Sequence, residues 1–559
     1  MSNLVPGLIM IVGGLLLPVI AKRFRNGVIL ALPVLVLFLI WRVPNGVVWT
    51  FTYLDYDLIP LQGSGTGKLF ATVFAIMAFV GALYAMHQAR LFELCAAYVY
   101  AGSAIGVTFC GDVISLFVFW EIMAITSTAV IWAAGTDTAY RASMRYLLLH
   151  LFGGVLLMVG IAGHVAETGS IVFGQMQADS LSRWLILAGF LINAGAPPFS
   201  AWIADAYPEG SPSGTVFLSA FTTKTAVYVL LVGFPGTAIL VPIGLYMVFY
   251  GIIYALLEND MRRILAYSIV NQVGFMVTGI GLGTEMALNG VASHAFAHII
   301  YKALLLMSAG AVLYQTGKRK CTDLGGLFQT MPVTTICGII GALAISSFPF
   351  TSGFVSKSMI SQSAADQHMA LVWFLLMAAS AGVFLHAGIK FPWYVFFQKD
   401  SGLRPTDPPW NMRVAMWLFA FLCIALGVYP APLYALLPFP VDYEPYTAAH
   451  LVAQFQLLLF AGLAFFIMLP QMKRTLTISL DFDWFYRRFG AAVAGEFTIK
   501  TFSARDGLEI RVRKGIERFI SGLYRHHGPK GILAQSWPVG SMVFFVVVLL
   551  GAYLIFYYS

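Results

Sequence analysis

Two histidines and a lysine recur at intervals of four residues within one apolar stretch. Residues Ser293–Met307 read SHAFAHIIYKALLLM, so His294, His298 and Lys302 are expected on one face of a helix. Neighbouring members of this stripe are about 6 Å apart along the helix axis, a gap that a water molecule can bridge. Imidazole titrates near neutral pH, and a desolvated lysine can also exchange its proton at physiological pH. The stripe therefore favours proton transfer; metal binding by the two histidines is the rival interpretation, but no third ligand is apparent.

Other ionisable side chains also fall in apolar stretches. A charge at the centre of a bilayer costs at least about 2.5 kcal/mol, so such groups are expected to be paired, hydrated or functional. Glu121 and Lys224 form an acid–base constellation in which separating the partners would load or unload a proton, and a static ion pair is the alternative. The predicted proton-transfer residues are Glu121, Lys224, His294, His298, Lys302 and Lys357, with His150, His386 and Lys390 as weaker candidates.

Composition places these residues in a membrane protein. Of the 559 residues, 59% are hydrophobic and 10% are charged, and the mean hydropathy is +0.82. The five cysteines are scattered without a C-x-x-C pair, so we expect no cofactor, no metal site and no catalytic residue. The formal net charge of +8 comes largely from loops that set membrane orientation, so nucleic acid is not an expected partner.

Apolar windows of about 20 residues, the length that crosses a bilayer, predict an all-α fold with sixteen membrane spans. Most Lys and Arg residues fall in loops on one side, which predicts that both termini face outward. The first apolar run lacks the flanks of a signal peptide and is expected to be retained as a span. The predicted spans are 4–20, 27–43, 68–88, 92–110, 112–134, 142–165, 183–204, 214–233, 237–257, 262–282, 287–313, 333–360, 370–397, 411–430, 451–470 and 540–558.

Two predicted spans contain helix breakers at mid-depth. The sequences AGAPPFSAW in span 183–204 and SSFPFTSGF in span 333–360 share a Pro-Phe-(Ser/Thr) motif. The two spans are five apart, so the copies would cross the bilayer in opposite directions, as in inverted repeats whose broken helices line a cavity. Chance is the alternative, because proline is common in membrane helices.

The organisation predicted from these patterns has six segments. A basic, amphipathic stretch precedes the last span, with Val512, Ile516, Phe519, Ile520 and Leu523 opposite Arg511, Arg513, Lys514, Arg518 and Arg525. It is expected to lie along a membrane face or a neighbouring subunit, or to serve as a plain surface helix. The segments are 1–90 (three spans), 91–235 (first repeat), 236–398 (second repeat), 399–470 (two spans), 471–539 (basic segment) and 540–559 (last span).

Six motifs in fixed order resemble a known family. They are LFVFWEIM, FTTKTAVYVLL, DMRRILAYSIVNQVGFM, SHAFAHIIYKALLLMSAG, DLGGLFQTMP and FPFTSGFVSK, spread from about residue 90 to residue 400. Together they resemble the proton-translocating antiporter-like family shared by respiratory complex I and the multisubunit Mrp Na⁺/H⁺ antiporters, and they look closest to the D-type Mrp subunits. FDWFYRR, which ends at Arg488, is similar to the start of the C-terminal extension with a lateral helix that some members carry.

The resemblance implies a 14-helix core containing two inverted five-helix repeats, spans four to eight and nine to thirteen, with broken helices 7 and 12. It also implies roles for single residues. Glu121, Lys224 and Lys357 would be the ionisable groups of spans five, eight and twelve, and the stripe His294, His298 and Lys302 would form the central connecting axis.

One position departs from the family pattern. Members usually carry a lysine shortly before the proline of the seventh span, where this chain has Asn193, which cannot hold a proton. The first half could conduct without that base, could use His150, or could be inactive. Asp205 keeps its family position within an otherwise altered loop, so Asn193 and Asp205 join His150 and Lys390 as candidate accessory residues.

The leading hypothesis is a proton-translocating subunit of a multisubunit complex in a bacterial cytoplasmic (inner) membrane, similar to the D-type component of an Mrp-type monovalent cation (Na⁺)/H⁺ antiporter. Its expected partners are other membrane subunits, the lipid bilayer, protons and a cation such as Na⁺. The alternatives are a proton channel in a redox-driven complex I-like or hydrogenase-like pump, a subunit of an inorganic-carbon uptake complex, and a non-conducting scaffold. Whether the chain belongs to an enzyme depends on which of these holds.

Overall fold

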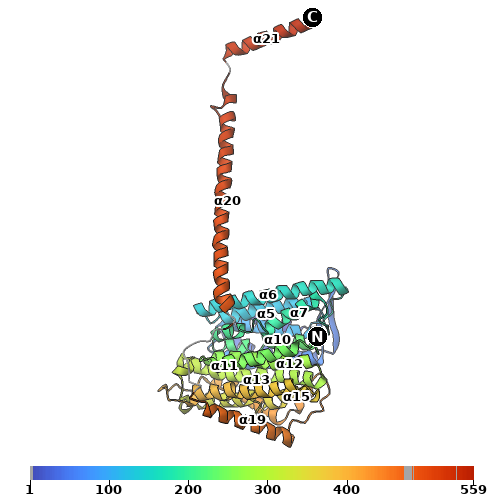
Figure 1. Cartoon of the computed structure of the whole chain (residues 1–559), viewed down its shortest axis with the longest axis vertical. Coiled ribbons are helices and arrows are strands. Elements are labelled where there is room, and N and C mark those ends of the chain that lie inside the picture. The colour runs from blue at the N-terminus through green and yellow to red at the C-terminus, as the bar shows by residue number, and fades with distance from the viewer. Residues whose placement is uncertain (1–3, 471–480, 482–483, 537) are drawn as a thin grey trace. The chain divides into compact units, whose positions relative to one another are not determined.

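The computed structural model describes residues 4–470, 481, 484–536 and 538–559. The chain divides into a large unit, Met1–Asp483, and a smaller one, Trp484–Ser559. The large unit is a bundle of packed helices (Figure 1). The predicted basic segment, 471–539, therefore lies partly outside the described residues, as does the beginning of the FDWFYRR motif.

Helices account for most of the large unit. In its first half they are α1 (Pro6–Leu16), α2 (Lys22–Arg42), α3 (Gly65–Ala85), α4 (Leu91–Phe109), α5 (Val113–Trp132), α6 (Asp137–Thr168), α7 (Leu181–Ala194), α8 (Trp202–Ala206), η1 (Tyr207–Glu209), α9 (Gly214–Leu218) and α10 (Thr222–Gly233). In its second half they are α11 (Leu240–Leu257), α12 (Met261–Leu282), α13 (Glu285–Thr316), η2 (Cys321–Asp323), η3 (Leu327–Gln329), α14 (Pro332–Ile345), α15 (Ser352–Asp366), α16 (Ala370–Val383), the π-helical turns η4 (Phe384–Lys390) and η5 (Trp393–Phe397), α17 (Trp410–Val428), α18 (Ala431–Tyr434) and α19 (Ala448–Ile467).

The predicted all-α membrane architecture is confirmed, but the count of sixteen full-length spans is too high. Across the described residues, thirteen helical stretches are long and apolar enough to cross a membrane. The other three predicted spans coincide with the shorter apolar helices α1, α7 and α14. Two of these, α7 and α14, are short because each ends at a predicted helix break. The predicted spans 183–204 and 333–360 were longer because the sequence stays apolar through the non-helical turn that follows each helix.

Both predicted breaks are present. α7 ends before Gly195, which has a φ of +80°, and the chain becomes helical again only at α8. α14 is followed by Ser347 and Phe350, with φ values of +57° and +67°, before α15 begins. A third interruption, between α9 and α10, was not predicted, because no proline or glycine marks it in the sequence. The inverted relation of the two halves stays a prediction.

A β-hairpin is the element that sequence reasoning missed. Strands β1 (Gly46–Tyr53) and β2 (Tyr56–Gly63) pair antiparallel between α2 and α3. Their β-branched and aromatic residues, in GVVWTFTY, favour a strand. The buried carboxylate of Asp112 accepts hydrogen bonds from the backbone N–H of Ile59 at 2.7 Å and of Ser115 at 2.6 Å, so the residue that caps α5 also fastens the hairpin.

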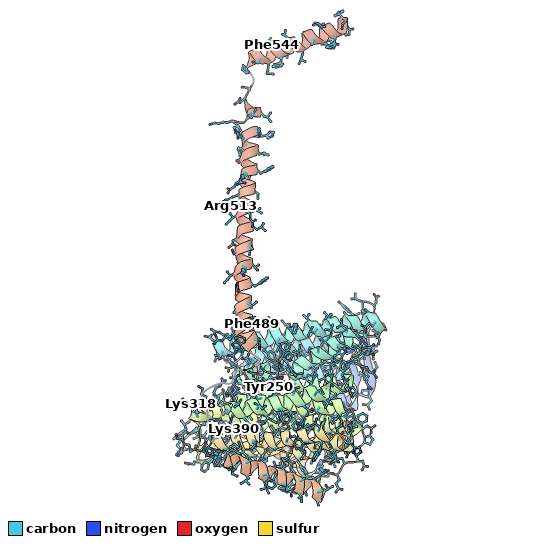
Figure 2. All side chains as sticks on the ribbon, in the orientation of Figure 1. Tyr250, Lys318, Lys390, Phe489, Arg513 and Phe544 are labelled. Carbon is cyan, nitrogen blue, oxygen red and sulfur yellow. The ribbon has the colours of Figure 1, made fainter. Side chains whose placement is uncertain are left out.

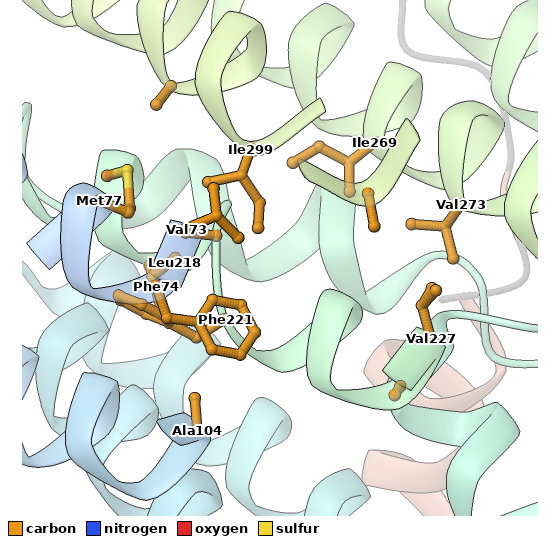
Figure 3. Close-up of a cluster of buried hydrophobic side chains, with 14 of the residues drawn as sticks. Val73, Phe74, Met77, Ala104, Leu218, Phe221, Val227, Ile269, Val273 and Ile299 are labelled. Atoms are coloured by element: carbon orange, nitrogen blue, oxygen red, sulfur yellow. The ribbon is translucent and has the colours of Figure 1, made fainter. Parts of the chain in front are cut away.

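The hydrophobic core joins the two halves of the large unit. Val73 and Phe74 of α3, Val227 of α10, Ile269 of α12 and Ile299 of α13 are all buried in one cluster (Figure 3). α12 is buried along its entire apolar window, and α13 along 94% of its own. These two helices are therefore shielded from lipid, and polar side chains on them face other protein groups.

The smaller unit consists of η6 (Phe485–Phe489), α20 (Gly490–His527), η7 (Ile532–Ala534) and α21 (Val539–Tyr558). The predicted amphipathic stretch is confirmed as part of the single helix α20, whose 38 residues span about 57 Å. Side chains such as Arg513 on α20 and Phe544 on α21 are exposed (Figure 2). The apolar side chains of α21 are therefore available to lipid or to a neighbouring chain.

Candidate functional site

The predicted stripe on α13 faces α12. His294, His298 and Lys302 are fully buried. The Nε2 atom of His294 lies 3.0 Å from Oε1 of Gln272, and Nζ of Lys302 donates a hydrogen bond to the hydroxyl of Ser268. Ser268 and Gln272 are four residues apart on α12, so one face of α12 meets the stripe over its length.

The second nitrogen of His294 faces α15. Its Nδ1 lies 3.0 Å from the hydroxyl oxygen of Ser356, the residue before Lys357. The hydroxyl of Tyr301 donates to the same Gln272 Oε1 at 3.1 Å. One imidazole thus connects α12, α13 and α15, and it does so next to the buried lysine of α15.

The orientation of Gln272 follows from its neighbours. The Nδ2 group of Asn271 donates to the carbonyl of Val248 at 2.9 Å, which leaves Oδ1 of Asn271 as the acceptor for Nε2 of Gln272. Oε1 of Gln272 must then face His294, and because that oxygen only accepts, Nε2 of His294 carries a proton.

The groups around His294 suit both charge states of the ring. When the hydroxyl of Ser356 donates to Nδ1, the imidazole is neutral. When that hydroxyl turns to the carbonyl of Ser352, 3.0 Å away, it can accept a hydrogen bond from a protonated Nδ1. Rotation of one hydroxyl therefore accommodates the gain of a proton without movement of the backbone.

His298 lies between these hydrogen-bonded groups. Neither of its buried ring nitrogens has a hydrogen-bond partner among the described protein groups. Its ring meets Tyr301 edge-on, with centroids 5.2 Å apart, and lies 6.2 Å from the ring of His294. Buried polar groups that lack protein partners usually bind internal water, so His298 marks a point where the axis requires water.

Lys357 is held by a ring and borders a cavity. Its ammonium lies 4.2 Å from the ring centroid of Phe275 on α12, and it has no hydrogen-bond partner in the described part of the chain. The adjacent cavity, hereafter the Lys357 cavity, has a volume of about 150 Å³. A cation over an aromatic face is stabilised without being neutralised, which leaves the amine able to exchange protons.

Lys224 is anchored by the unpredicted break between α9 and α10. Its Nζ donates to the carbonyl of Ser219 at 2.6 Å and to the hydroxyl of Thr223 at 3.0 Å. That carbonyl is available because the helix is interrupted there. α10 packs against α12 and α13, the helices that carry the stripe and its partners. Lys224 therefore lies on a helix that adjoins the stripe.

Glu121 and Lys224, predicted as an acid–base constellation or a static ion pair, are not paired in this structure, where Lys224 has other partners. Their part in proton transfer stays a prediction. The Oε1 atom of Glu121 is buried without a hydrogen-bond partner among the described residues. The carboxylate lies against Gly154 of α6, where an added Cβ would fall 2.1 Å from Oε1. His150 is one turn away on the same face of α6. Glu121 thus contacts the helix that carries the candidate accessory histidine.

Substituting alanine for Gly154 is expected to displace the carboxylate of Glu121 without removing any titratable group from the chain, because the new methyl group would overlap Oε1. We expect a partial loss of proton flux, about threefold to tenfold, since proton transfer depends on donor–acceptor geometry. Dye-monitored flux through the complex in vesicles measures this. The matched control is Gly174→Ala, where the added methyl meets open space; equal flux in both variants would contradict a role for the Glu121 position.

Polar atoms without protein partners also gather in the first half. His150 donates from Nδ1 to the carbonyl of Tyr146 at 2.9 Å, so its unpartnered Nε2 has a free lone pair. Both side-chain polar atoms of Asn193 are buried without partners in the described chain. Trp202 connects the two regions: its ring meets that of His150 at 4.6 Å, and its indole N–H donates to the carbonyl of Ile192. Trp202 thus links His150 to the segment in which the family has lysine.

The other accessory candidates have structural partners. Nζ of Lys390 donates to the carbonyls of Ala255 at 3.1 Å, Leu256 at 2.5 Å and Glu258 at 2.7 Å, at the end of α11. Asp205 receives two hydrogen bonds from Arg145, at 2.8 and 2.9 Å. Both groups are engaged in fixed contacts, unlike the unpartnered amine of Lys357.

A second polar cluster, hereafter the charged junction, joins the loop after α8 to α12. The buried guanidinium of Arg262 donates to the carbonyls of Pro208 at 2.8 Å and Gly210 at 2.9 Å. It also donates to the carbonyl of Ser211 at 2.9 Å and to the hydroxyl of Thr215. These contacts fix the start of α12 against the segment that leads into α9.

Arg319 completes the charged junction by pairing with Glu209 at 2.8 Å and with Asp260. Burial raises the pKa of Glu209, but the hydrogen bond and charge of Arg319 outweigh burial and hold that pKa below its ordinary value. Burial lowers the pKa of Arg319, and the charges and hydrogen bonds of Asp260 and Glu209 more than reverse this effect. Glu209 and Arg319 therefore stay ionised at neutral pH.

The structure adds uncharged residues that sequence reasoning did not single out. Ser268, Gln272 and Phe275 line the α12 side of the axis and contact Lys302, His294 and Lys357, respectively. The signal was present in AYSIVNQVGF, where two polar residues recur at four-residue spacing within an apolar helix. It was overlooked because only titratable residues were considered.

Comparison with known families decides the class of the protein. The family model for the transmembrane region of NADH:quinone oxidoreductase and Mrp antiporter subunits matches residues 110–384. All six predicted proton-transfer residues, from Glu121 to Lys357, fall within this interval. The chain belongs to this family.

Relatives of this antiporter-like chain extend the comparison. The D-type component of the Na⁺/H⁺ antiporter of Alkalihalophilus pseudofirmus is 32% identical over 273 residues, which cover 45% of this chain and 55% of that relative. A chain of the Mrp complex from Dietzia sp. DQ12-45-1b matches with a TM-score of 0.74 and 19% identity, covering 98% of this chain and 62% of the other. A chain of the membrane-bound sulfane sulfur reductase, an archaeal respiratory complex, matches with a TM-score of 0.73 and 21% identity over 99% and 100%. The two structures show the shared fold.

Proposed function

We propose that this chain is a proton-translocating subunit of a multisubunit membrane complex, related to the D-type component of the Mrp-type cation/proton antiporters. The proposal depends chiefly on His294, whose two ring nitrogens meet Gln272 on α12 and Ser356 on α15. This imidazole connects the stripe on α13 with α15, where Lys357 directly follows Ser356, and its neighbours suit either charge state of the ring. Family membership supports the same function.

The proton route proposed here runs through Lys224, Lys302, His298 and His294 to Lys357, with Glu121 and His150 in the first half. Every member is buried or half-buried, and the steps at His298 and Lys357 require water, because those groups lack protein partners in the described chain. A chain of such groups moves protons by successive exchange and needs no cofactor of its own.

The drive for transport would come from partner subunits. Exchange against Na⁺ or another monovalent cation is the leading candidate, because a component of a Na⁺/H⁺ antiporter is among the relatives. A redox-driven complex is the second candidate, because the sulfane sulfur reductase chain matches this fold over its whole length. Genes for small Mrp-type subunits beside this one would favour the first, and genes for a redox module the second. We propose that the complex lies in a bacterial cytoplasmic membrane, and the distribution of Lys and Arg favours an outward position of both termini.

Exchanging Lys357 for methionine in the assembled complex is expected to abolish most proton flux, a loss of about 100-fold, because methionine keeps the packing but cannot hold a proton. Dye-monitored proton uptake by proteoliposomes after an imposed membrane potential measures it. The control is Lys318→Met, since Lys318 is exposed at the end of α13 (Figure 2). Normal flux in an intact Lys357→Met complex would establish the non-conducting scaffold instead.

A further inference from the structure

The Lys357 cavity leads from the buried axis toward the end of α15. Ser358, Ser361 and Gln362 line it on the α15 side. Exposure rises along this helix: Lys357 is only 3% exposed, the three lining residues are half-buried, and Asp366 is exposed. The cavity therefore occupies the stretch over which α15 passes from the protein interior to the surface.

A histidine from a helix outside the two predicted repeats closes the other side of the cavity. His450 lies in the first turn of α19, and its Nε2 is 3.2 Å from Oε1 of Gln362. The Nε2 group of Gln362 donates to Asp366 at 2.8 Å, so Oε1 is the atom that faces His450. His450 is consequently a donor at Nε2. Its buried Nδ1 has no hydrogen-bond partner in the described chain.

The position of His450 is fixed by its surroundings. One turn further along α19, the side chain of Gln454 donates to the carbonyl of Ser346 at 3.2 Å, which attaches α19 to the break before α15. The ring of Tyr443 packs against the imidazole, with centroids 5.8 Å apart. The groups that face His450 are thus Gln362 on α15, Tyr443 before α19, and Lys357 across the cavity.

We propose that the Lys357 cavity is the aqueous mouth of the proton route and that His450 passes protons between Lys357 and the water at the end of α15. One proton leaves Nζ of Lys357, cavity water relays it, and Nδ1 of His450 binds it; release to bulk water restores the neutral imidazole, and the reverse sequence loads Lys357. The cavity volume of about 150 Å³ accommodates several water molecules. This inference depends on the proposed function and adds a helix, α19, to the route.

The first test exchanges His450 for glutamine or alanine in the complete complex. Glutamine retains hydrogen bonding but cannot bind a proton, so both variants are expected to lower the flux about tenfold. Full flux with glutamine and reduced flux with alanine would show that His450 is only structural and would overturn the proposal. Loss of flux in Lys357→Met together with normal flux in both His450 variants would overturn this inference and leave the proposed function standing.

Chemical rescue separates a proton carrier from a packing residue. Imidazole at millimolar concentration, added to the His450→Ala complex, is expected to restore most of the flux, because the site is half-buried and borders the surface. The same addition is expected to leave Lys357→Met inactive. Failure of imidazole to restore the alanine variant, with the complex intact, would contradict proton passage through residue 450.

The water content of the cavity is tested separately by thiol labelling. Ser361→Cys, which lines the cavity, is expected to react with a membrane-impermeant thiol reagent from the side where α15 ends. Ser363→Cys is the matched control, because Ser363 is buried and its hydroxyl lies 2.6 Å from that of Thr284, away from the cavity. Reaction of the wild-type cysteines is subtracted. An unreactive Ser361→Cys would refute an aqueous mouth.

Discussion

Replacement of His294 by asparagine is expected to lower proton flux through the assembled complex by about 100-fold, because a positioned proton carrier contributes roughly 10²–10⁴-fold to transfer. Asparagine can still donate to Gln272 and stays polar, so the loss isolates the ability of the ring to bind a proton. Stopped-flow acidification of proteoliposomes containing a pH-sensitive dye measures the flux. The yield of assembled complex shows whether the fold is intact.

A milder change at the same point provides the control. Ser356→Ala removes the hydroxyl that lies 3.0 Å from Nδ1 but keeps the imidazole. We expect a reduction of about tenfold or less, because water can replace a hydroxyl partner. If His294→Asn left the flux at the level of the wild type, the connection between the two halves would run elsewhere, and the route proposed through α13 would be wrong.

The second large effect is expected at Arg262, where leucine should destabilise the fold by about 3–5 kcal/mol. The substitution leaves the buried carbonyls of Pro208 and Gly210 without this donor and removes one of the donors to Ser211, and each lost partner of a buried group costs about 1–3 kcal/mol. Lysine is expected to restore only part of the stability, because a single ammonium cannot reproduce the planar fork of a guanidinium. Thermal unfolding of the purified complex and its yield from membranes report the loss.

Arg404→Leu is the matched control for the charged junction. Arg404 pairs with Asp400 four residues away, and both side chains are largely exposed. Exposed ion pairs contribute little to stability, so this variant should unfold like the wild type. Equal stability of the Arg262 and Arg404 variants would mean that the junction does not hold α12 in place.

The titratable part of the axis could be predicted because charge in an apolar window is conspicuous. The spacing of His294, His298 and Lys302 was sufficient to place them on one face, and the structure confirms that this face is turned toward α12. The breaks after α7 and α14 were also predicted, because Pro-Phe motifs are incompatible with a continuous helix. The unusual asparagine at position 193 was recognised only from the resemblance to the family, because hydropathy does not show that members usually have lysine there.

The features that could not be predicted from the sequence depend on contacts between segments that are far apart in the chain. Glu121 faces Gly154 and not Lys224, and no local pattern states which helices will be neighbours. His450 resembles an ordinary residue at a helix start, and only the packing of α19 against α15 shows its contact with Gln362. The hairpin was missed because its strands lie between two strong membrane windows, where a loop is the default expectation.

Lys390 and Lys357 are both buried amines, but their contacts differ, so different residues are expected to be able to replace them. The first is surrounded by carbonyl dipoles and is useful only while it remains charged, so a guanidinium, which never loses its charge, could serve there. The second rests on an aromatic face with no oxygen to hold its charge in place, and a group unable to become neutral would block that position. On the proposed proton route, arginine is therefore expected to be tolerated in place of Lys390 and not in place of Lys357.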